Sequence, residues 1–260
     1  MAHANEYLNA QEEGPAKKLQ FTFKIGIGSN YFFEIAKLRA LRILWSKLID
    51  VYNLDADCFI TAVPSRRNKT LYDYNVNMLR TTTECMSAIL GGANTIYNTP
   101  YDHIYHKDNE FGERIARNQL LILQHESFLN QVSNPADGSY YIESITQQLA
   151  QKALDLFKII EAGDGFLAQL KAHHIQKKIK ESAQKEQDAY DAQNEILVGS
   201  NSYQDTTEQM SGSIELYPFL KKQPKKTIIE PIIERRLSEV WEQERLKKEP
   251  QPYNPTNAKK

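Results

Sequence analysis

Cysteine is scarce in this sequence, and long hydrophobic runs are missing from it. The two cysteines among its 260 residues, Cys58 and Cys85, are too few for a disulfide framework and indicate small buried residues of a reducing compartment. No uninterrupted apolar stretch reaches the roughly 18 residues of a membrane-spanning helix. Residues 1–6 have neither a basic end nor an apolar segment, so they do not resemble a secretory signal. These absences predict a cytoplasmic protein without membrane contact.

Net charge and most catalytic motifs are also lacking. Thirty-two Lys and Arg residues against 33 Asp and Glu residues leave a formal charge of −1, so no overall charge directs the protein to nucleic acid. Neither a Gly-x-Ser-x-Gly sequence, a P-loop nor a Cys-x-x-Cys pair occurs. Gly26-Ile-Gly28 invites a dinucleotide interpretation, but the third glycine of that fingerprint is replaced by Tyr31. Taken alone, the composition and spacing support no particular reaction.

Strand-like and helix-like segments alternate along the chain. Period-two alternation at 21–27 and short branched or aromatic runs at 58–63 and 95–97 predict three strands, and residues 195–198 suggest a last one. Between and after them, helical spacing predicts helices over 31–52, 76–90, 110–128, 142–160 and 165–193, with a charged helix ending near residue 248. This order is typical of an α/β protein with parallel strands and crossover helices.

Two of these helices have predicted buried faces. In the helix over 76–90, the apolar face would consist of Val76, Leu79, Thr83, Met86 and Leu90. The centre of the helix over 110–128 is apolar nearly all round, which predicts heavy burial and a structural role for His125. About four strands are too few for a closed parallel barrel, which needs about eight. The sheet is therefore either open and doubly wound or part of a larger barrel.

Two polar clusters are candidate sites. Ser65-Arg-Arg-Asn-Lys69 directly follows the second strand, where cations of a parallel sheet can meet a phosphate or carboxylate. The alternative is a solvated basic loop. Asp102, His103 and His106 have metal-binding side chains close together, but no further ligand is evident, so we expect no metal site.

Several ordered motifs over residues 20–200 resemble the methylmalonyl-CoA mutase family. They are Gly28-Ser-Asn-Tyr-Phe-Phe-Glu-Ile-Ala-Lys-Leu-Arg-Ala40, Tyr74-Asn-Val-Asn-Met-Leu-Arg-Thr-Thr-Thr-Glu84, Leu90-Gly-Gly-Ala-Asn-Thr95, Arg114-Ile-Ala-Arg-Asn-Gln119 and Asn134-Pro-Ala-Asp-Gly-Ser-Tyr-Tyr-Ile-Glu143. The resemblance implies a TIM-type barrel for the acyl-CoA substrate and a separate domain for adenosylcobalamin. It also implies rearrangement between succinyl-CoA and methylmalonyl-CoA.

The chain departs from the catalytic members of that family at two places. In the region of their Arg-x-His-x-Gln-Thr-Ser-Gly run, this chain has Ile60-Thr-Ala-Val-Pro-Ser-Arg-Arg67, which contains no histidine, and we expect Thr61 in place of the active-site histidine. A threonine cannot supply an imidazole to the thioester carbonyl. The Asp-x-His-x-x-Gly motif of cobalamin binding is absent as well. No catalytic, cofactor-binding or metal-binding residue is therefore predicted, and Arg66, Arg67 and Lys69 are the candidate substrate contacts.

Two segments resemble the small (beta) subunit of heterodimeric mutases. They are Ser65-Arg-Arg-Asn-Lys-Thr-Leu-Tyr-Asp73 and Ile228-Ile-Glu-Pro-Ile-Ile-Glu-Arg-Arg236. The resemblance divides the chain into a truncated lead-in at 1–18, the C-terminal half of a (β/α) barrel at 19–200, and a linker with a charged helical tail at 201–260. The N-terminal half of the barrel would be missing, and its absence would leave the edges of the sheet uncovered.

Three hypotheses follow. The first is a non-catalytic small subunit that supports a large (alpha) catalytic chain, with adenosylcobalamin and acyl-CoA bound at the level of the complex. The second is an acyl-CoA mutase barrel that binds substrate itself and receives cobalamin from a partner chain. The third is a helical partner-binding protein unrelated to coenzyme A chemistry, which would lack a parallel sheet.

Overall fold

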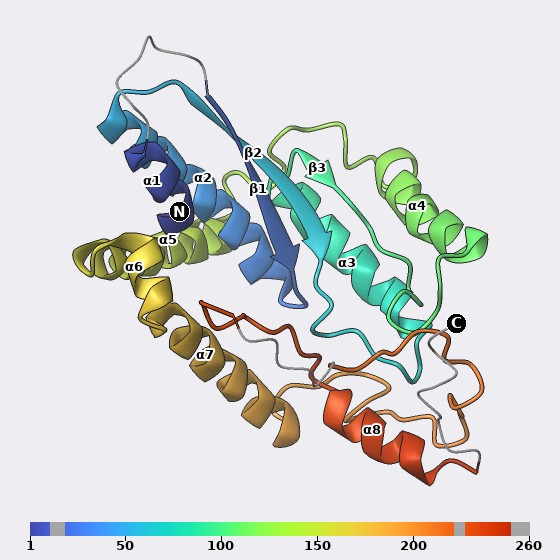
Figure 1. Cartoon of the computed structure of the whole chain (residues 1–260). Coiled ribbons are helices and arrows are strands. Elements are labelled where there is room, and N and C mark those ends of the chain that lie inside the picture. Colours follow the sequence, from blue (N-terminus) through green and yellow to red (C-terminus); the bar gives the residue numbers. More distant parts are fainter. Residues whose placement is uncertain (11–18, 221–226, 251–260) are drawn as a thin grey trace.

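The computed structural model describes residues 1–10, 19–220 and 227–250. Within these ranges it contains a three-stranded sheet and eight helices (Figure 1). In chain order the elements are α1 (Ala2–Asn9), β1 (Leu19–Ile27), α2 (Tyr31–Tyr52), β2 (Ala56–Pro64), α3 (Val76–Leu90), β3 (Thr95–Ile96), α4 (Glu110–His125), α5 (Tyr140–Ala162), α6 (Gly165–Lys171), α7 (His174–Asp191) and α8 (Glu239–Lys248).

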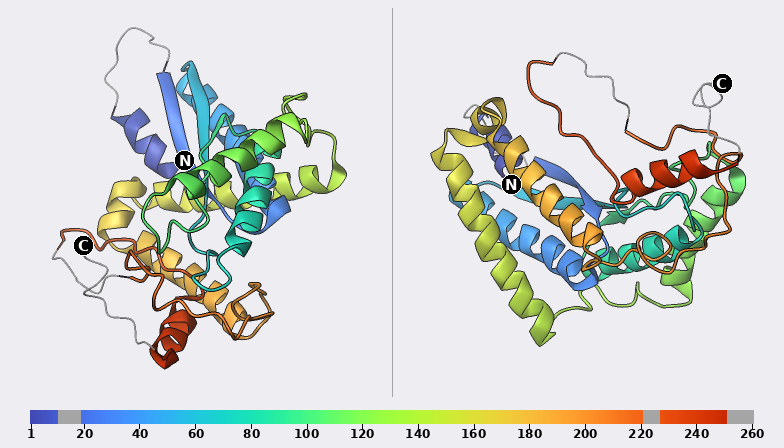
Figure 2. Two further views of the ribbon diagram at one scale, coloured as in Figure 1. Left: turned by 90° about the vertical axis from the view of Figure 1, so that its right-hand side faces the viewer. Right: turned by 90° about the horizontal axis from the view of Figure 1, so that it is seen from below.

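The sheet is parallel, with the strands in the order β1-β2-β3. Phe23 stands opposite Ile60, and Thr61 stands opposite Thr95. A parallel arrangement requires a crossover between successive strands, and α2 and α3 supply it on the same side of the sheet (Figure 2). The predicted α/β class is therefore confirmed, and a parallel sheet excludes the hypothesis of a purely helical protein.

The two faces of the sheet differ in what covers them. Ile60 and Ala62 are fully buried and pack with Leu38 of α2 and Ala88 of α3. On the opposite face of β1, the side chains at alternate positions are exposed, namely Gln20, Thr22, Lys24 and Gly26. The sheet is thus covered on one side by its crossover helices, and its second side is open at β1.

Capping and packing explain where α2 begins and ends. The side chain of Asn30 accepts a hydrogen bond from the backbone N–H of Phe33 at 3.3 Å, and Asn53 adopts the left-handed conformation that ends the helix. Trp45 packs between Phe21 and Phe23 of β1, with ring centroids 4.7 and 5.0 Å away. These aromatic contacts fix α2 against the first strand.

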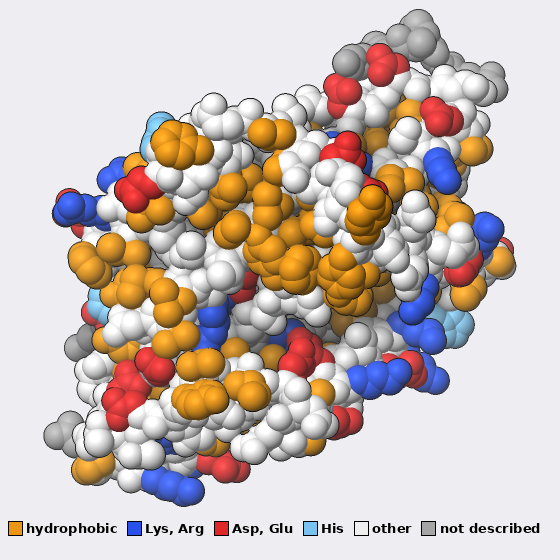
Figure 3. Space-filling view, turned by 180° about the vertical axis from the view of Figure 1, so that it is seen from behind, with side chains coloured by type: hydrophobic (Ala, Val, Ile, Leu, Met, Phe, Trp, Pro, Cys, Tyr) orange, Lys and Arg blue, Asp and Glu red, His pale blue; other side chains and the backbone are white. Residues whose placement is uncertain are grey.

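The elements after α4 are the helices α5, α6, α7 and α8. α5 packs along α2, and Arg39 of α2 is ion-paired with Glu143 of α5. α7 and α8 lie beyond the C-terminal ends of the strands (Figure 1). On the face that points away from the viewer in Figure 1, hydrophobic side chains gather near the middle (Figure 3). Within the described parts of the chain, no helix combines the length and apolar character that crossing a membrane requires.

Several details differ from the sequence-based predictions. Residues 195–198 form no strand and contribute one isolated bridge, between Val198 and Ser202. The helix predicted over 165–193 is broken in two at His173, whose φ of 63° lies in the left-handed region. Residues 11–18 of the lead-in, and 221–226 and 251–260 of the tail, lie outside the described residues.

Burial also differs from the prediction in α4. Leu121 and Ile122 are 42% and 43% exposed, Leu123 is buried, and His125 is exposed in the last turn. Because one side of α4 faces α3 and its opposite side faces solvent, an apolar composition all round the helix did not produce burial all round it. Cys85 is buried as predicted, whereas Cys58 is half-buried.

Candidate functional site

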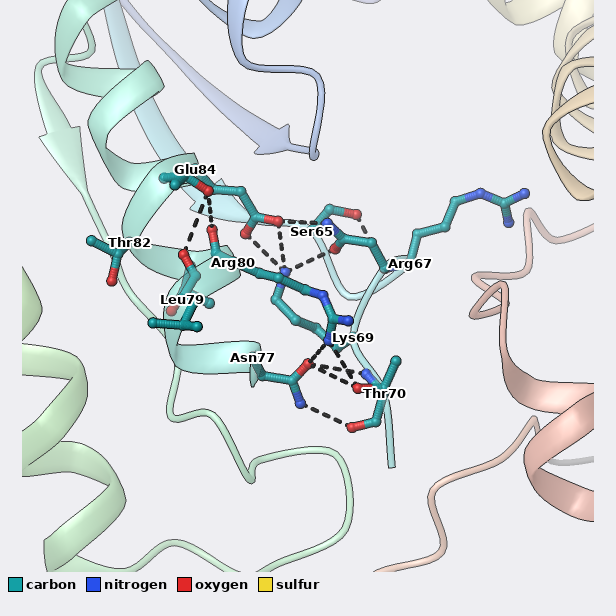
Figure 4. Close-up of polar contacts among 12 residues, drawn as sticks. Ser65, Arg67, Lys69, Thr70, Asn77, Leu79, Arg80, Thr82 and Glu84 are labelled. Carbon is teal, nitrogen blue, oxygen red and sulfur yellow. Dashed lines mark hydrogen bonds and ion pairs between the residues drawn. The ribbon is translucent and has the colours of Figure 1, made fainter. Parts of the chain in front are cut away.

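The segment that follows β2, residues 65–73, is the candidate site because it leaves the C-terminal end of a parallel strand. It contains all three predicted substrate contacts, and its surroundings are drawn in Figure 4. It connects β2 to α3, and the C-terminal part of the chain lies against it. We call residues 65–73 the β2–α3 loop.

A buried ion pair holds the centre of this loop. The Nζ atom of Lys69 lies 2.8 Å from both carboxylate oxygens of Glu84 on α3, and both side chains are 1% exposed. Asn68 also contributes, since its Oδ1 accepts from Lys69 at 2.8 Å and its amide donates to Glu84 at 2.6 Å. Burial lowers the pKa of Lys69 and raises the pKa of Glu84, while the pairing acts against both shifts. This lysine is a structural charge in the described chain.

A second network fixes the end of the loop to the first turns of α3. The Asn77 side chain accepts from the Thr70 backbone N–H at 3.1 Å and donates to the Thr70 carbonyl at 2.9 Å. Arg80 donates to Thr70 Oγ1 and Asn77 Oδ1 at 2.9 and 2.8 Å. Burial lowers the pKa of Arg80 to about 10. Side chains of α3 therefore hold the loop at residues 68–70.

The face of α3 that carries these partners is not the predicted one. Leu79 is 67% exposed and Thr83 is exposed, although both belong to the predicted apolar face. The buried positions include Asn77, Thr81 and Glu84. The polar side is buried because Lys69 and Thr70 need partners there, so the requirement for hydrogen bonds and charge pairing overrode hydrophobic periodicity.

The C-terminal segment covers the outer side of the β2–α3 loop. The backbone N–H of Leu237 donates to the carbonyl of Arg67 at 2.9 Å, and Arg236 donates to the carbonyl of Lys69 at 3.1 Å. Glu242 of α8 accepts from the backbone N–H of Leu71 at 2.7 Å and pairs with Arg236 at 2.5 Å. Because Arg236 and Glu242 are themselves buried, this contact is part of the folded core.

The three predicted substrate contacts have different surroundings. Lys69 is buried in its ion pair, as described above. Arg67 pairs with Glu186 of α7 and donates to the carbonyls of Ala183 and Arg235. Arg66 is exposed, and its guanidinium has no partner among the described residues. The fold thus directs two of the three cations to partners within the chain and leaves Arg66 facing solvent.

Thr61 lies in the middle of β2 and is half-buried. Strand alternation puts it on the opposite side from the buried residues Ile60 and Ala62, so it belongs to the face that the crossover helices do not cover. Its neighbours in register are Lys24 and Thr95. The side chain is therefore on the sheet face that would point inward if the sheet were continued into a barrel.

His103 is the histidine whose pKa is clearly displaced. Its Nδ1–H donates to the carbonyl of Pro100 at 2.6 Å, and its Nε2 is buried without a partner among the described residues. Burial, with the charges of Arg66 and Lys69, lowers the pKa of His103 to about 4. Within the described ranges, no group of three or more His, Cys, Asp or Glu side chains is placed to hold a metal ion.

The sequence analysis did not identify Glu84, Arg236 and Glu242 as partners of the β2–α3 loop. Glu84 had a usable signal, since it is an acidic residue within a largely uncharged helical segment and lies 15 positions after Lys69. No sequence signal pointed to Arg236 or Glu242, because their partners in the β2–α3 loop lie more than 160 positions earlier in the chain.

The fold and loop define a protein of the parallel β/α class with helical crossovers and a tightly held loop at the C-terminal end of β2. The sequence profile described as Methylmalonyl-CoA mutase matches residues 4–244. The chain belongs to the methylmalonyl-CoA mutase family.

Individual relatives agree with this assignment. The chain is 40% identical over 206 residues to a methylmalonyl-CoA mutase small subunit of Porphyromonas gingivalis, covering 77% of this chain and 33% of that protein. It is 40% identical over 178 residues to a small subunit of Streptomyces virginiae (66% and 29%), and 38% identical over 202 residues to a methylmalonyl-CoA mutase of Rhizobium meliloti (75% and 28%). The chain thus spans about a third or less of the length of these relatives.

The Lys69–Glu84 pair gives a first prediction. Glu84→Gln leaves the Lys69 charge buried without its carboxylate, so we expect the free energy of unfolding to fall by about 3–5 kcal/mol. Urea unfolding monitored by circular dichroism measures this loss. The exposed Glu244→Gln on α8 is the matched control, and the double variant Lys69→Met/Glu84→Gln should recover much of the loss. An unchanged midpoint for Glu84→Gln would contradict the buried pair.

His103 gives a prediction about pH. Its pKa in the folded protein lies below the usual 6.5, so the unfolded chain binds the proton more tightly. The contribution of neutral His103 to the free energy of unfolding is therefore fully present above pH 6.5 and is lost as the pH falls towards 4. The loss amounts to about 3 kcal/mol at pH 4. In urea titrations from pH 7 to pH 4, His103→Asn should flatten this part of the profile, whereas His125→Asn on the exposed turn of α4 should not. Equal slopes for both variants would contradict the assignment.

Proposed function

We propose that this chain is a non-catalytic small subunit of an adenosylcobalamin-dependent methylmalonyl-CoA mutase. In this role it would support a large catalytic chain in the cytoplasm, and the complex would interconvert succinyl-CoA and methylmalonyl-CoA. We further propose that residues 19–200 are the C-terminal half of a (β/α) barrel, with 1–18 as a truncated lead-in and 201–260 as linker and charged tail. The parallel sheet, whose crossover helices cover one face and whose first strand pairs only with β2 among the described residues, supports that architecture.

The observation that carries the proposal is that residues 60–67, in the region of the catalytic members' Arg-x-His-x-Gln-Thr-Ser-Gly run, contain no histidine. Thr61, which we expect in place of that histidine, lies on the sheet face that the crossover helices leave uncovered. A hydroxyl cannot donate a proton or polarise a thioester carbonyl as an imidazole does. The pairing of Arg67 and Lys69 within the chain, and the covering of the β2–α3 loop by the C-terminal segment, support the same conclusion.

The residues of this chain do not fit a resident cobalamin. The sequence lacks the Asp-x-His-x-x-Gly motif that would supply a lower axial ligand. His103 is half-buried, with its Nδ1–H bonded to the carbonyl of Pro100. The other histidines lie on α1, beside the start of α4, in its last turn and at the α6–α7 junction. We therefore assign the cofactor to the partner chain and derive no step through it here.

The proposal predicts dependence on a partner for activity. Purified chain supplied with succinyl-CoA and adenosylcobalamin should form no methylmalonyl-CoA, and turnover should appear when the large chain of the same organism is added. Chromatography of the acyl-CoA products measures both results. A large chain carrying a substituted active-site histidine is the control, since the mixture should then stay inactive. Turnover by this chain alone would refute the proposed role.

A second candidate function is that the chain binds acyl-CoA itself and receives cobalamin from a partner. Arg66 favours it, because this cation is exposed, follows the C-terminal end of β2 and lacks a partner among the described residues. Arg67 and Lys69 would be further contacts if the loop opened.

This alternative predicts coenzyme A binding that depends on Arg66. Titration calorimetry of the purified chain with coenzyme A should then show affinity, reduced about tenfold or more by Arg66→Ala because one charged contact is lost. Arg117→Ala, at an exposed position on α4, is the control. Absence of binding to the unsubstituted chain would leave the support role as the better account. Cobalamin difference spectra with and without the partner separate the two functions further.

A further inference from the structure

A cleft of about 440 Å³ lies between α7 and the stretch of chain that leads to α8. Residues 230–235 of this stretch, which we call the isoleucine segment, form no helix, strand or turn. Two side chains of α7 hold the stretch in place. Gln176 donates to the carbonyl of Glu230 at 3.2 Å, and Gln187 donates to the carbonyl of Leu237, also at 3.2 Å. The cleft is therefore bounded by a helix on one side and an irregular segment on the other.

The walls of the cleft are partly apolar. Ile179 of α7 lines it, together with Ile232 and Ile233 of the isoleucine segment, and all three side chains are exposed. Leu220, which is half-buried, also lines it. Exposed branched side chains around a hollow are unfavourable in water, so an apolar side chain of a ligand would gain free energy by covering them.

A buried amide oxygen without a partner also belongs to the cleft. Gln176 lines the cleft and is only 2% exposed. Its Nε2 donates to the carbonyls of Leu170 and Glu230, whereas its Oε1 accepts no hydrogen bond from the described residues. Leaving a buried acceptor unpaired costs free energy. A ligand that brings an N–H group to this oxygen would remove that cost.

The backbone of the isoleucine segment is unpaired as well. Neither the N–H groups nor the carbonyls of Ile232, Ile233 and Glu234 have a hydrogen-bond partner among the described residues. Unpaired backbone groups on an exposed segment can pair with a second chain in an extended conformation. The kind of ligand that offers both a row of backbone groups and apolar side chains is a peptide.

The charges around the cleft favour a ligand with acidic groups. Arg67, Lys180 and Arg235 line it, and Glu230 is the acidic residue among the lining side chains. Arg67 and Lys180 are ion-paired within the chain. The guanidinium of Arg235 is exposed and has no partner among the described residues, while the neighbouring Glu234 does not line the cleft. Arg235 is therefore free to pair with a carboxylate.

We propose that this cleft binds an extended acidic segment of a partner protein. A backbone N–H of the bound segment would donate to Oε1 of Gln176, and its neighbouring backbone groups would pair with Ile232 and Ile233. A branched apolar side chain would lie between Ile179 and Ile232, and an acidic side chain would pair with Arg235. The inference does not rest on the proposed mutase role, because no residue of the sheet takes part.

Fluorescence anisotropy of the full 260-residue chain with three labelled hexapeptides tests the inference. The first probe alternates valine and glutamate, and the second alternates valine and lysine. The third is the glutamate probe with methyl groups on its backbone nitrogens. We expect the glutamate probe to bind with a dissociation constant of about 100 μM or lower. The other two should bind about tenfold or more weakly, because they lack either the carboxylates or the N–H donors.

Substitutions locate the bound peptide. Arg235→Gln removes the free cation, and Ile232→Ala removes part of the apolar wall; both side chains are exposed, so the fold should tolerate the changes. Each should weaken binding of the glutamate probe about fivefold or more. Ile228→Ala is the matched control, because Ile228 is fully exposed two residues before the isoleucine segment and does not line the cleft. Circular dichroism checks that all three variants fold.

Three binding results would overturn the inference. They are no binding of the glutamate probe at about 1 mM, equal binding of either of the other two probes, and binding that Arg235→Gln and Ile232→Ala leave unchanged. Self-association of the chain that Arg235→Gln abolishes would also overturn it, because a second copy would then be the occupant. The turnover assay with the large chain uses none of these probes, so its outcome stays distinguishable from theirs.

Discussion

The parallel pairing of the strands is the constraint on which the organisation of this chain depends. Two adjacent parallel strands cannot be joined by a tight turn, so each connection between them needs a crossover, here a helix. Here the series runs from β1 to the two-residue β3, with α2 and α3 covering one face. Among the described residues, β1 pairs only with β2, and an apolar groove lies beside it.

Beyond the C-terminal end of β2, buried ion pairs hold separate segments of the chain together. The pairs Lys69–Glu84 and Arg236–Glu242 hold the β2–α3 loop between α3 and the C-terminal segment. A buried ion pair contributes little net stability, but removal of one partner is costly, so such pairs fix an arrangement more than they strengthen it. A cation used in this way is not free to meet a phosphate. The same contacts that order the ligand end of β2 thus reduce what it offers to a ligand.

The chain belongs to the methylmalonyl-CoA mutase family, and Thr61 lies on the sheet face that the crossover helices leave uncovered. An apolar groove lies beside β1, and several large hydrophobic side chains are exposed on the helices. These features agree with the support role that we propose.

The sequence by itself determined the order of elements and the family. Alternation at 21–27 and helical spacing at 31–52 are local signals, so the first strand and helix were predicted closely. The motifs over 20–200 indicated the family that the comparisons confirm. The basic loop after β2 was also located from sequence, although the candidate contacts within it remain a prediction.

Only the tertiary structure decided which face of α3 is buried and which cations are paired. Periodicity registers hydrophobicity along one helix, and it assigned Leu79 to the core because it could not register the need of Lys69 for a carboxylate. Arg67 meets Glu186, and Leu71 meets Glu242, across separations of 119 and 171 residues. Contacts of that range leave no local pattern, since they exist only when distant segments fold together.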